Sequence, residues 1–99
     1  MRVRKTADLA SALTRKGFRP QERDHTFYFL YVGNQKTKVR TKISHGSDEY
    51  GPNLLSQMSK QLHLDGEEFE ALVECPLTQQ DYLELLVQRG ELPADMPRE

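Results

Sequence analysis

Basic residues alternate with apolar residues or threonine along the stretch Lys36-Thr37-Lys38-Val39-Arg40-Thr41-Lys42-Ile43. A period of two indicates a β-strand, because successive side chains of a strand point to opposite faces of its sheet. We therefore expect a cationic row on one face, while the residues between its members pack on a core. A solvated edge strand is the alternative, because lysine on an edge also blocks unwanted strand pairing.

Charge is sorted by position along the chain. Residues 1–45 hold 11 Lys/Arg and 3 Asp/Glu, a balance of +8, whereas residues 46–99 hold 3 and 12, a balance of −9. The net charge of −1 hides this asymmetry. A basic half of this kind favours a nucleic acid or another acidic partner. Four side chains are the candidate contacts to RNA: Lys36, Lys38, Arg40 and Lys42.

Length and composition limit the classes of protein to consider. A chain of 99 residues suffices for one small domain. No apolar run approaches the ~20 residues of a membrane span, and the basic N-terminus lacks the apolar stretch of a signal peptide. We therefore expect a cytoplasmic protein without membrane contact. The single cysteine, Cys75, predicts no internal disulfide and is expected to be a small buried side chain. The histidines and Cys75 are too scattered to predict a metal site, and no cofactor is expected.

Two segments upstream of the basic strand predict a helix and an edge strand. The helix should begin at Thr6, where Thr6 and Asp8 can cap the first amides, and should end at Gly17. A short strand follows over residues 18–21, and Pro20 marks it as an edge of the sheet.

The run His25-Thr26-Phe27-Tyr28-Phe29-Leu30-Tyr31-Val32 has the aromatic and β-branched content of a strand. Gly33-Asn34 predicts a turn from this run into the basic strand, so the two strands form an antiparallel hairpin. Residues whose numbers sum to about 69 should then pair. Because the run is apolar on both parities, the sequence leaves open which parity faces the core. An exposed Phe27 or Tyr28 could stack on a base, but we expect both in the core.

The C-terminal half predicts three helices. Their boundaries follow from a proline, two capping pairs and a glycine: Pro52, Asp65 with Glu68, Thr78 with Asp81, and Gly90. The expected apolar stripe of the first consists of Leu54, Leu55, Met58 and Leu62. The acidic residues around 67–74 can be a solvated helix face, or they can lie near the basic strand and shield it. Residues 91–99 are expected to be a flexible tail.

The expected fold class is α+β, with a two-layer α-β-β-β-α arrangement over residues 1–64. A three-stranded antiparallel sheet can bury one face under helices and leave the other face open. The acidic helices of residues 65–90 are expected to form an extension packed on the same domain.

Three local patterns add a resemblance over about residues 6–64. Lys16-Gly17-Phe18 closes the first helix, His25 opens the second strand, and Ser44-His45-Gly46 follows the basic strand. With the order of elements, these patterns resemble the HicA family of bacterial toxins, small proteins with a double-stranded-RNA-binding-type fold. The resemblance implies an mRNA interferase of a toxin–antitoxin pair, with an antitoxin protein as its partner.

Metal-free cleavage of RNA needs a base for the ribose 2′-hydroxyl, an acid for the leaving oxygen and positive charge near the phosphate. Histidine serves as base or acid near neutral pH. His25 is the candidate general base, and the hairpin register brings His45 and Lys42 near it. Three alternatives stay open: an inert His25 capped by Asp24, a non-catalytic RNA-binding module, and a protein-interaction domain without RNA.

Overall fold

The computed structural model describes residues 2–74 and 76–94, so the predictions for Cys75 and for residues 95–99 lie outside the described residues. The elements follow in the order β1 Arg4–Lys5, α1 Thr6–Arg15, β2 Phe18–Glu22, β3 Thr26–Val32, β4 Gln35–Ile43, β5 Glu49–Tyr50, α2 Pro52–Gln61, α3 Gly66–Glu74 and α4 Gln79–Gln88. The expected α+β class is confirmed.

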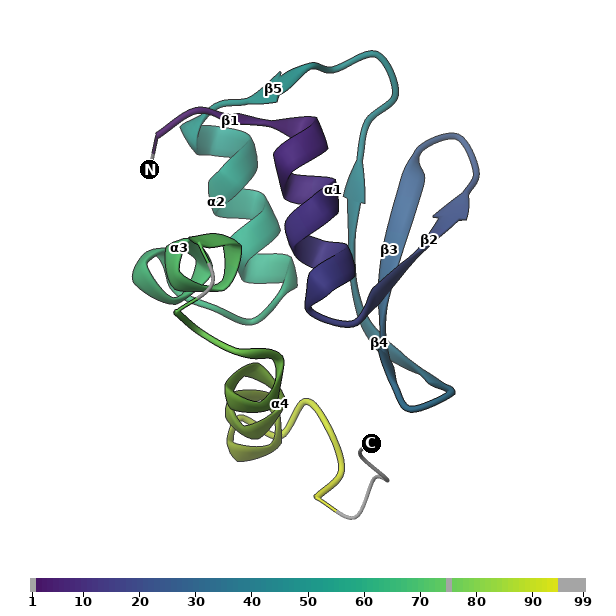
Figure 1. Ribbon diagram of the computed structural model, residues 1–99, viewed down its shortest axis with the longest axis vertical. Helices are drawn as coiled ribbons and strands as arrows, with labels where there is room; N and C mark the ends of the chain where they lie inside the picture. Colours follow the sequence, from purple (N-terminus) through teal and green to yellow (C-terminus); the bar gives the residue numbers. More distant parts are fainter. Residues whose placement is uncertain (1, 75, 95–99) are drawn as a thin grey trace.

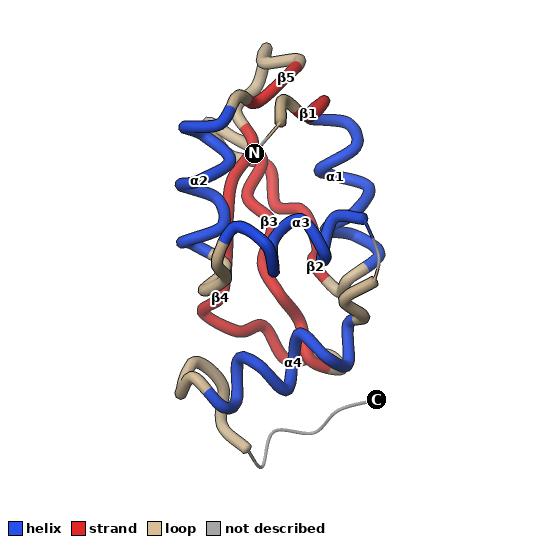
Figure 2. Tube along the Cα trace, turned by 90° about the vertical axis from the view of Figure 1, so that its left-hand side faces the viewer, coloured by secondary structure: helices blue, strands red, loops and turns tan. Residues whose placement is uncertain are grey.

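A three-stranded antiparallel sheet in the order β2-β3-β4 forms the centre of the fold. Figures 1 and 2 show α1 and α2 packed side by side on one face of this sheet, with α3 crossing over both helices. The α4 helix lies toward the end of the sheet that carries the β3–β4 turn (Figure 1). No described helix covers the opposite face, which we call the open face.

The β3–β4 register confirms the expected pairing. Thr26 pairs with Ile43, Phe27 with Lys42 and Phe29 with Arg40, each pair summing to 69. An irregularity between Phe29 and Tyr31 then shifts the register. The alternation in β4 is also confirmed, because its four cationic side chains are exposed and the residues between them are buried.

The parity of β3, which the sequence left open, follows from this register. Tyr28, Leu30 and Val32 are buried under the helices, whereas the alternate residues are only partly buried. Within the core, Thr37 donates its hydroxyl hydrogen to the carbonyl of Leu30 (2.8 Å), which satisfies a polar group that burial would otherwise penalise.

The α1 helix packs Leu9, Ala12 and Leu13 into the core and ends before Gly17, which has a φ of +98°. The expected cap at its N-terminus is wrong, because Lys5 occupies the N-cap position and no side chain caps the helix. The Thr6 amide donates instead to the carbonyl of Asp48 (2.8 Å). Backbone across the fold thus satisfies a free helix amide.

A second, two-stranded sheet lies outside the strands that the sequence predicts. β1 pairs antiparallel with β5, with Arg4 opposite Tyr50 and Lys5 opposite Glu49. Tyr50 is buried, and its hydroxyl oxygen accepts a hydrogen bond from the amide of Ser44 (2.9 Å). The segment between β4 and α2 therefore contains a short strand that ties the N-terminus to the end of β4.

The boundaries of the C-terminal helices agree with the sequence. Pro52 opens α2, and both capping pairs form reciprocal hydrogen bonds at the starts of α3 and α4. The predicted α2 stripe is wrong at Leu54, whose residue is 42% exposed, whereas its other three members are buried. Leu54 lies about 100° from Leu55 around the helix, which puts it at the edge of the face that Leu55, Met58 and Leu62 bury.

The acidic helices share one core with the sheet. The Tyr82 ring stacks on Phe18 with centroids 6.1 Å apart, and its hydroxyl donates to the carbonyl of Leu62 (3.0 Å). The buried Lys16 ammonium donates to the carbonyl of Leu77 (2.7 Å), between α3 and α4. Leu92 is also buried at 7% exposure, so the packed chain extends into the first residues of the predicted tail.

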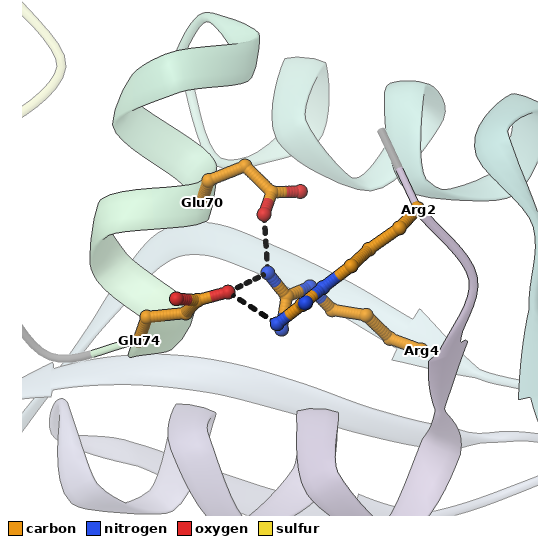
Figure 3. A network of polar contacts seen from close by, with 4 residues as sticks. All are labelled: Arg2, Arg4, Glu70 and Glu74. Carbon is orange, nitrogen blue, oxygen red and sulfur yellow. Dashed lines mark hydrogen bonds and ion pairs between the residues drawn. The ribbon is translucent and has the colours of Figure 1, made fainter.

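Two arginines of the N-terminal segment bind two carboxylates of α3 (Figure 3). Arg4, whose side chain is 9% exposed, donates to Glu70 and to Glu74 (2.6 Å), and Arg2 also donates to Glu74 (2.7 Å). The hydrogen bond from Arg4 lowers the pKa of Glu74. The network ties α3 to β1, so part of the acidic half neutralises the N-terminus of the basic half.

The end of α2 yields a prediction about stability, because His63 occupies the left-handed region with a φ of +63°. The Leu64 amide donates to Ser59 (2.9 Å) and the His63 amide to Lys60 (3.1 Å), the pattern in which glycine is preferred at this position. The free energy of unfolding, measured in urea, should therefore be higher for His63→Gly than for His63→Ala by about 1 kcal/mol. The alanine variant is the control for lost side-chain contacts, and equal stability of the two variants would contradict the prediction.

The hydrogen bonds of Glu68 predict a loss of stability in acid. Arg89 donates to both carboxylate oxygens (2.9 and 2.6 Å) and the Asp65 amide donates to one, and these bonds lower the pKa of Glu68. A lowered pKa contributes stability above the unfolded value of about 4.3, and this stability is lost as the pH falls through the folded pKa. When the pH is lowered from about 7 to about 3, the free energy of unfolding measured in urea should fall less for Glu68→Gln than for the native chain. The exposed neighbour variant Glu67→Gln is the control, and an unchanged drop in Glu68→Gln would contradict the assignment.

Candidate nucleic-acid interface

The open face of the sheet combines aromatic and cationic side chains from three strands. The residues facing outward are Arg19 and Gln21 from β2, Phe27, Phe29 and Tyr31 from β3, and Lys36, Lys38, Arg40 and Lys42 from β4. Cross-strand pairing sets Phe27 beside Lys42, Phe29 between Arg19 and Arg40, and Tyr31 beside Lys36. None of these nine outward positions holds a carboxylate.

The three rings lie along one strand at alternate positions. Phe27 and Phe29 stack with centroids 6.3 Å apart and an interplanar angle of 28°. Tyr28 lies in the core as expected, but the expectation of a core Phe27 is wrong, because Phe27 is only partly buried and faces outward. The reason is the pairing register, which sets the odd-numbered residues of β3 beside the cations of β4.

Two cations of this face lie over the rings. The Lys36 ammonium is 3.9 Å from the centroid of Phe29, and the Arg19 guanidinium carbon is 4.2 Å from that of Tyr31. Lys36 also donates to the side chain of Gln21 (3.0 Å), and Arg19 to the carbonyl of Gly33 (3.2 Å). Contacts of this type at exposed sites contribute about 0.5–1 kcal/mol, so the rings are covered by side chains that a stronger ligand can displace.

The cationic row of β4 is largely free of carboxylates. Among residues 2–74 and 76–94, neither Arg40 nor Lys42 has an ion-pair partner, and Lys38 approaches Glu91 only at 3.9 Å. The carboxylates of α3 bind elsewhere: Glu70 and Glu74 bind N-terminal arginines, and Glu68 binds Arg89. The acidic helix therefore does not shield the basic strand through these residues.

A shallow hollow of about 270 Å³ lies at the β4 edge of this surface. Its lining residues are Phe27, Arg40, Thr41, Lys42 and Gln61. The hollow connects the open face to the end of α2 and offers two cations beside an aromatic ring.

Two of the three histidines, His25 and His45, lie together at the end of the sheet opposite the β3–β4 turn. His25 directly precedes β3 and His45 follows β4, and their ring centroids are 6.4 Å apart. The Nε2 atom of His45 is 3.0 Å from the hydroxyl of Thr26 and 3.0 Å from a carboxylate oxygen of Glu22. The buried Nδ1 atom of His25 has no hydrogen-bond partner. The predicted pair is thus brought together, and Glu22 and Thr26 are partners that sequence reasoning missed.

The histidine pair and the cationic row occupy different parts of the hairpin. Thr26 and Glu22 pair with each other and carry the parity of the helix-covered face, and Thr26 pairs with the buried Ile43. Lys42 lies beside Phe27 on the open face. The arrangement can support acid–base chemistry at the sheet end and phosphate binding on the adjoining face.

The other candidate sites carry no comparable arrangement. His63 lies after α2, where its ring approaches Glu91 at 3.5 Å. Within the described residues, no group of three His, Cys, Asp or Glu side chains is placed to hold a metal ion. No described helix is long and apolar enough to cross a membrane.

The assignment of function depends on these residues themselves. Comparison with known proteins finds no matching family model, no matching curated protein and no matching solved structure.

Proposed function

We propose that this chain acts on RNA as a HicA-like, metal-independent ribonuclease that holds its substrate on the open face of the sheet. The observation that carries the proposal is the composition of this face, where five cations flank three aromatic rings and none of the nine outward positions holds a carboxylate. Lysine and arginine bind phosphates through charge, and aromatic rings contact bases. A bacterial cytoplasmic enzyme of this kind would be neutralised by an antitoxin protein.

The order of elements supports the HicA-like assignment. Apart from the two-residue strand β5 before α2, the segment from α1 to α2 has the α-β-β-β-α order of a double-stranded-RNA-binding-type domain, and α3 and α4 are an addition. Gly17 ends α1 with a positive φ, and His25 lies at the start of the second strand of the sheet. These are the positions on which the sequence resemblance rests.

The proposed chemistry assigns one role to each histidine. His25 accepts the proton of a ribose 2′-hydroxyl as its oxygen attacks the adjacent phosphorus. The bond from phosphorus to the 5′-oxygen breaks, and protonated His45 donates a proton to that oxygen, which leaves a cyclic phosphate. Glu22 orients the His45 ring, and cations of β4 stabilise the charge that develops on the phosphate.

A specific observation favours a second candidate, a non-catalytic RNA-binding module. His45 is engaged by both Glu22 and Thr26, and these partners carry the parity of the helix-covered face rather than that of the cationic face. In this candidate the contacts of His45 with Glu22 and Thr26 only stabilise the end of the sheet, and RNA binds to the open face without being cleaved.

Cleavage of a fluorescent mixed-sequence RNA in EDTA separates the two candidates. We expect native protein to cleave, and His25→Ala and His45→Ala to lose activity by about 100-fold or more, the usual contribution of a general acid or base. His63→Ala is the matched control, because His63 lies outside the pair, and it should cleave like the native protein. Equal cleavage by all four proteins would refute the histidine assignment. RNA binding without cleavage by any of the four proteins would refute the ribonuclease and support the non-catalytic RNA-binding module.

The salt dependence of RNA binding tests the cationic row. Each phosphate neutralised on a single strand contributes about 0.7 to the slope of log affinity against log salt. Arg40→Gln and Lys42→Gln should each reduce this slope by about that amount. Lys60→Gln removes an exposed cation of α2 and should leave the slope unchanged. Slopes that fall equally in all three variants would indicate binding by net charge rather than by this face.

A further inference from the structure

We infer that Phe27, Phe29 and Tyr31 form a base-stacking platform, so that the open face takes single-stranded rather than double-stranded RNA. This inference rests on the proposed function and deepens it by naming the class of substrate. The double-stranded-RNA-binding-type order of the fold does not predict it, because the platform depends on which side chains the sheet exposes.

The spacing of the rings suits successive unpaired bases. The three residues occupy alternate positions of one strand, which sets neighbouring side chains about 7 Å apart along the sheet. Phe27 and Phe29 are nearly parallel, at 28°, and all three rings are partly exposed. Every base has a π-face, so a platform of this kind binds without needing a particular sequence.

The cations flank the rings on both sides. Arg19 lies on the β2 side, and the four cations of β4 lie on the other. A single strand running along β3 can therefore place its bases on the rings and its phosphates against β4. A duplex holds its bases inside its own stack, so it would meet only the charges and leave the rings unused.

The cations that cover two of the rings are compatible with this binding. Lys36 over Phe29 and Arg19 over Tyr31 are long, flexible surface side chains. A base that displaces either one provides a larger stacking area, and the displaced cation becomes available to a phosphate. In the absence of RNA the same side chains shield the rings from water.

The charge of the face argues against a second copy of this chain as the occupant. Pairing two open faces would bring five cations against five, with no carboxylate among the outward positions to compensate. An occupant with regularly spaced negative charge and flat apolar groups matches the face better, and a single nucleic-acid strand has both.

The test uses the full chain and three fluorescent probes of equal length. The first is a single-stranded 2′-O-methyl RNA, which lacks the hydroxyl that the proposed cleavage needs. The second is the same strand annealed to its complement, and the third is an abasic strand with the same number of phosphates. We expect the native protein to bind the first at least about tenfold more tightly than the third, and more tightly than the duplex.

Two substitutions at one position provide a matched pair. Phe29→Leu should lose about tenfold in affinity for the single strand and nothing for the abasic strand, whereas Phe29→Tyr should keep both affinities. Circular dichroism and urea midpoints establish that each variant is folded. The comparison of probes with native protein stands even if the leucine variant does not fold.

Three outcomes would overturn the platform. Equal native affinity for all three probes, unchanged by Phe29→Leu, would remove base stacking while leaving phosphate binding and the proposed action on RNA. Self-association of the native chain that Phe29→Leu abolishes would assign the face to a second copy. Failure of the folded native protein to bind any probe at low salt would remove the proposed function together with the platform.

Discussion

The pairing register of β3 and β4 is the constraint on which the rest of the structure depends. A shift of one residue would exchange the faces of every side chain in a strand. With Phe27 opposite Lys42 and Phe29 opposite Arg40, the even-numbered cations of β4 and the odd-numbered aromatic residues of β3 must share a face. The opposite parity, with Leu30 and Val39 fully buried, then defines the core. One register thus creates both the hydrophobic core and the candidate interface.

The helices complete this division and explain the sorting of charge. Because α1, α2, α3 and α4 all contribute to the core side, no described helix covers the open face, and Glu91 approaches it only at Lys38. Carboxylates of the acidic half bind arginines outside β4: Glu70 and Glu74 bind Arg4, and Glu68 binds Arg89. The basic half is therefore neutralised at its N-terminus and left positive along β4. Net charge near zero and a strongly cationic face are compatible for this reason.

The sequence predicted what depends on local chemistry. Alternation identified β4, glycine and proline marked element ends, and capping pairs located the starts of α3 and α4, because each signal acts within a few residues. The β1–β5 pairing was missed because strands of two residues carry no periodicity, and Thr6 was misassigned because its amide bonds to Asp48 far along the chain. The outward position of Phe27 could have been predicted from the sequence. A register sum of 69 is odd, so an exposed even row in β4 implies an exposed odd row in β3.

The candidate site depends on the same hairpin at both of its ends. Tyr31 lies near the turn and His25 lies at the opposite end, six residues away, which corresponds to about 20 Å of extended strand. A single strand of RNA held along β3 in our proposal would extend toward the histidine pair, because the direction of the rings leads there. In this proposal, one part of the RNA strand is bound on the open face while another part reaches the histidine pair, where acid–base chemistry takes place. In this proposal the His45 ring must present a proton to a phosphate that arrives from the open face. Its contacts with Glu22 and Thr26 must therefore hold the ring in an orientation that allows this transfer.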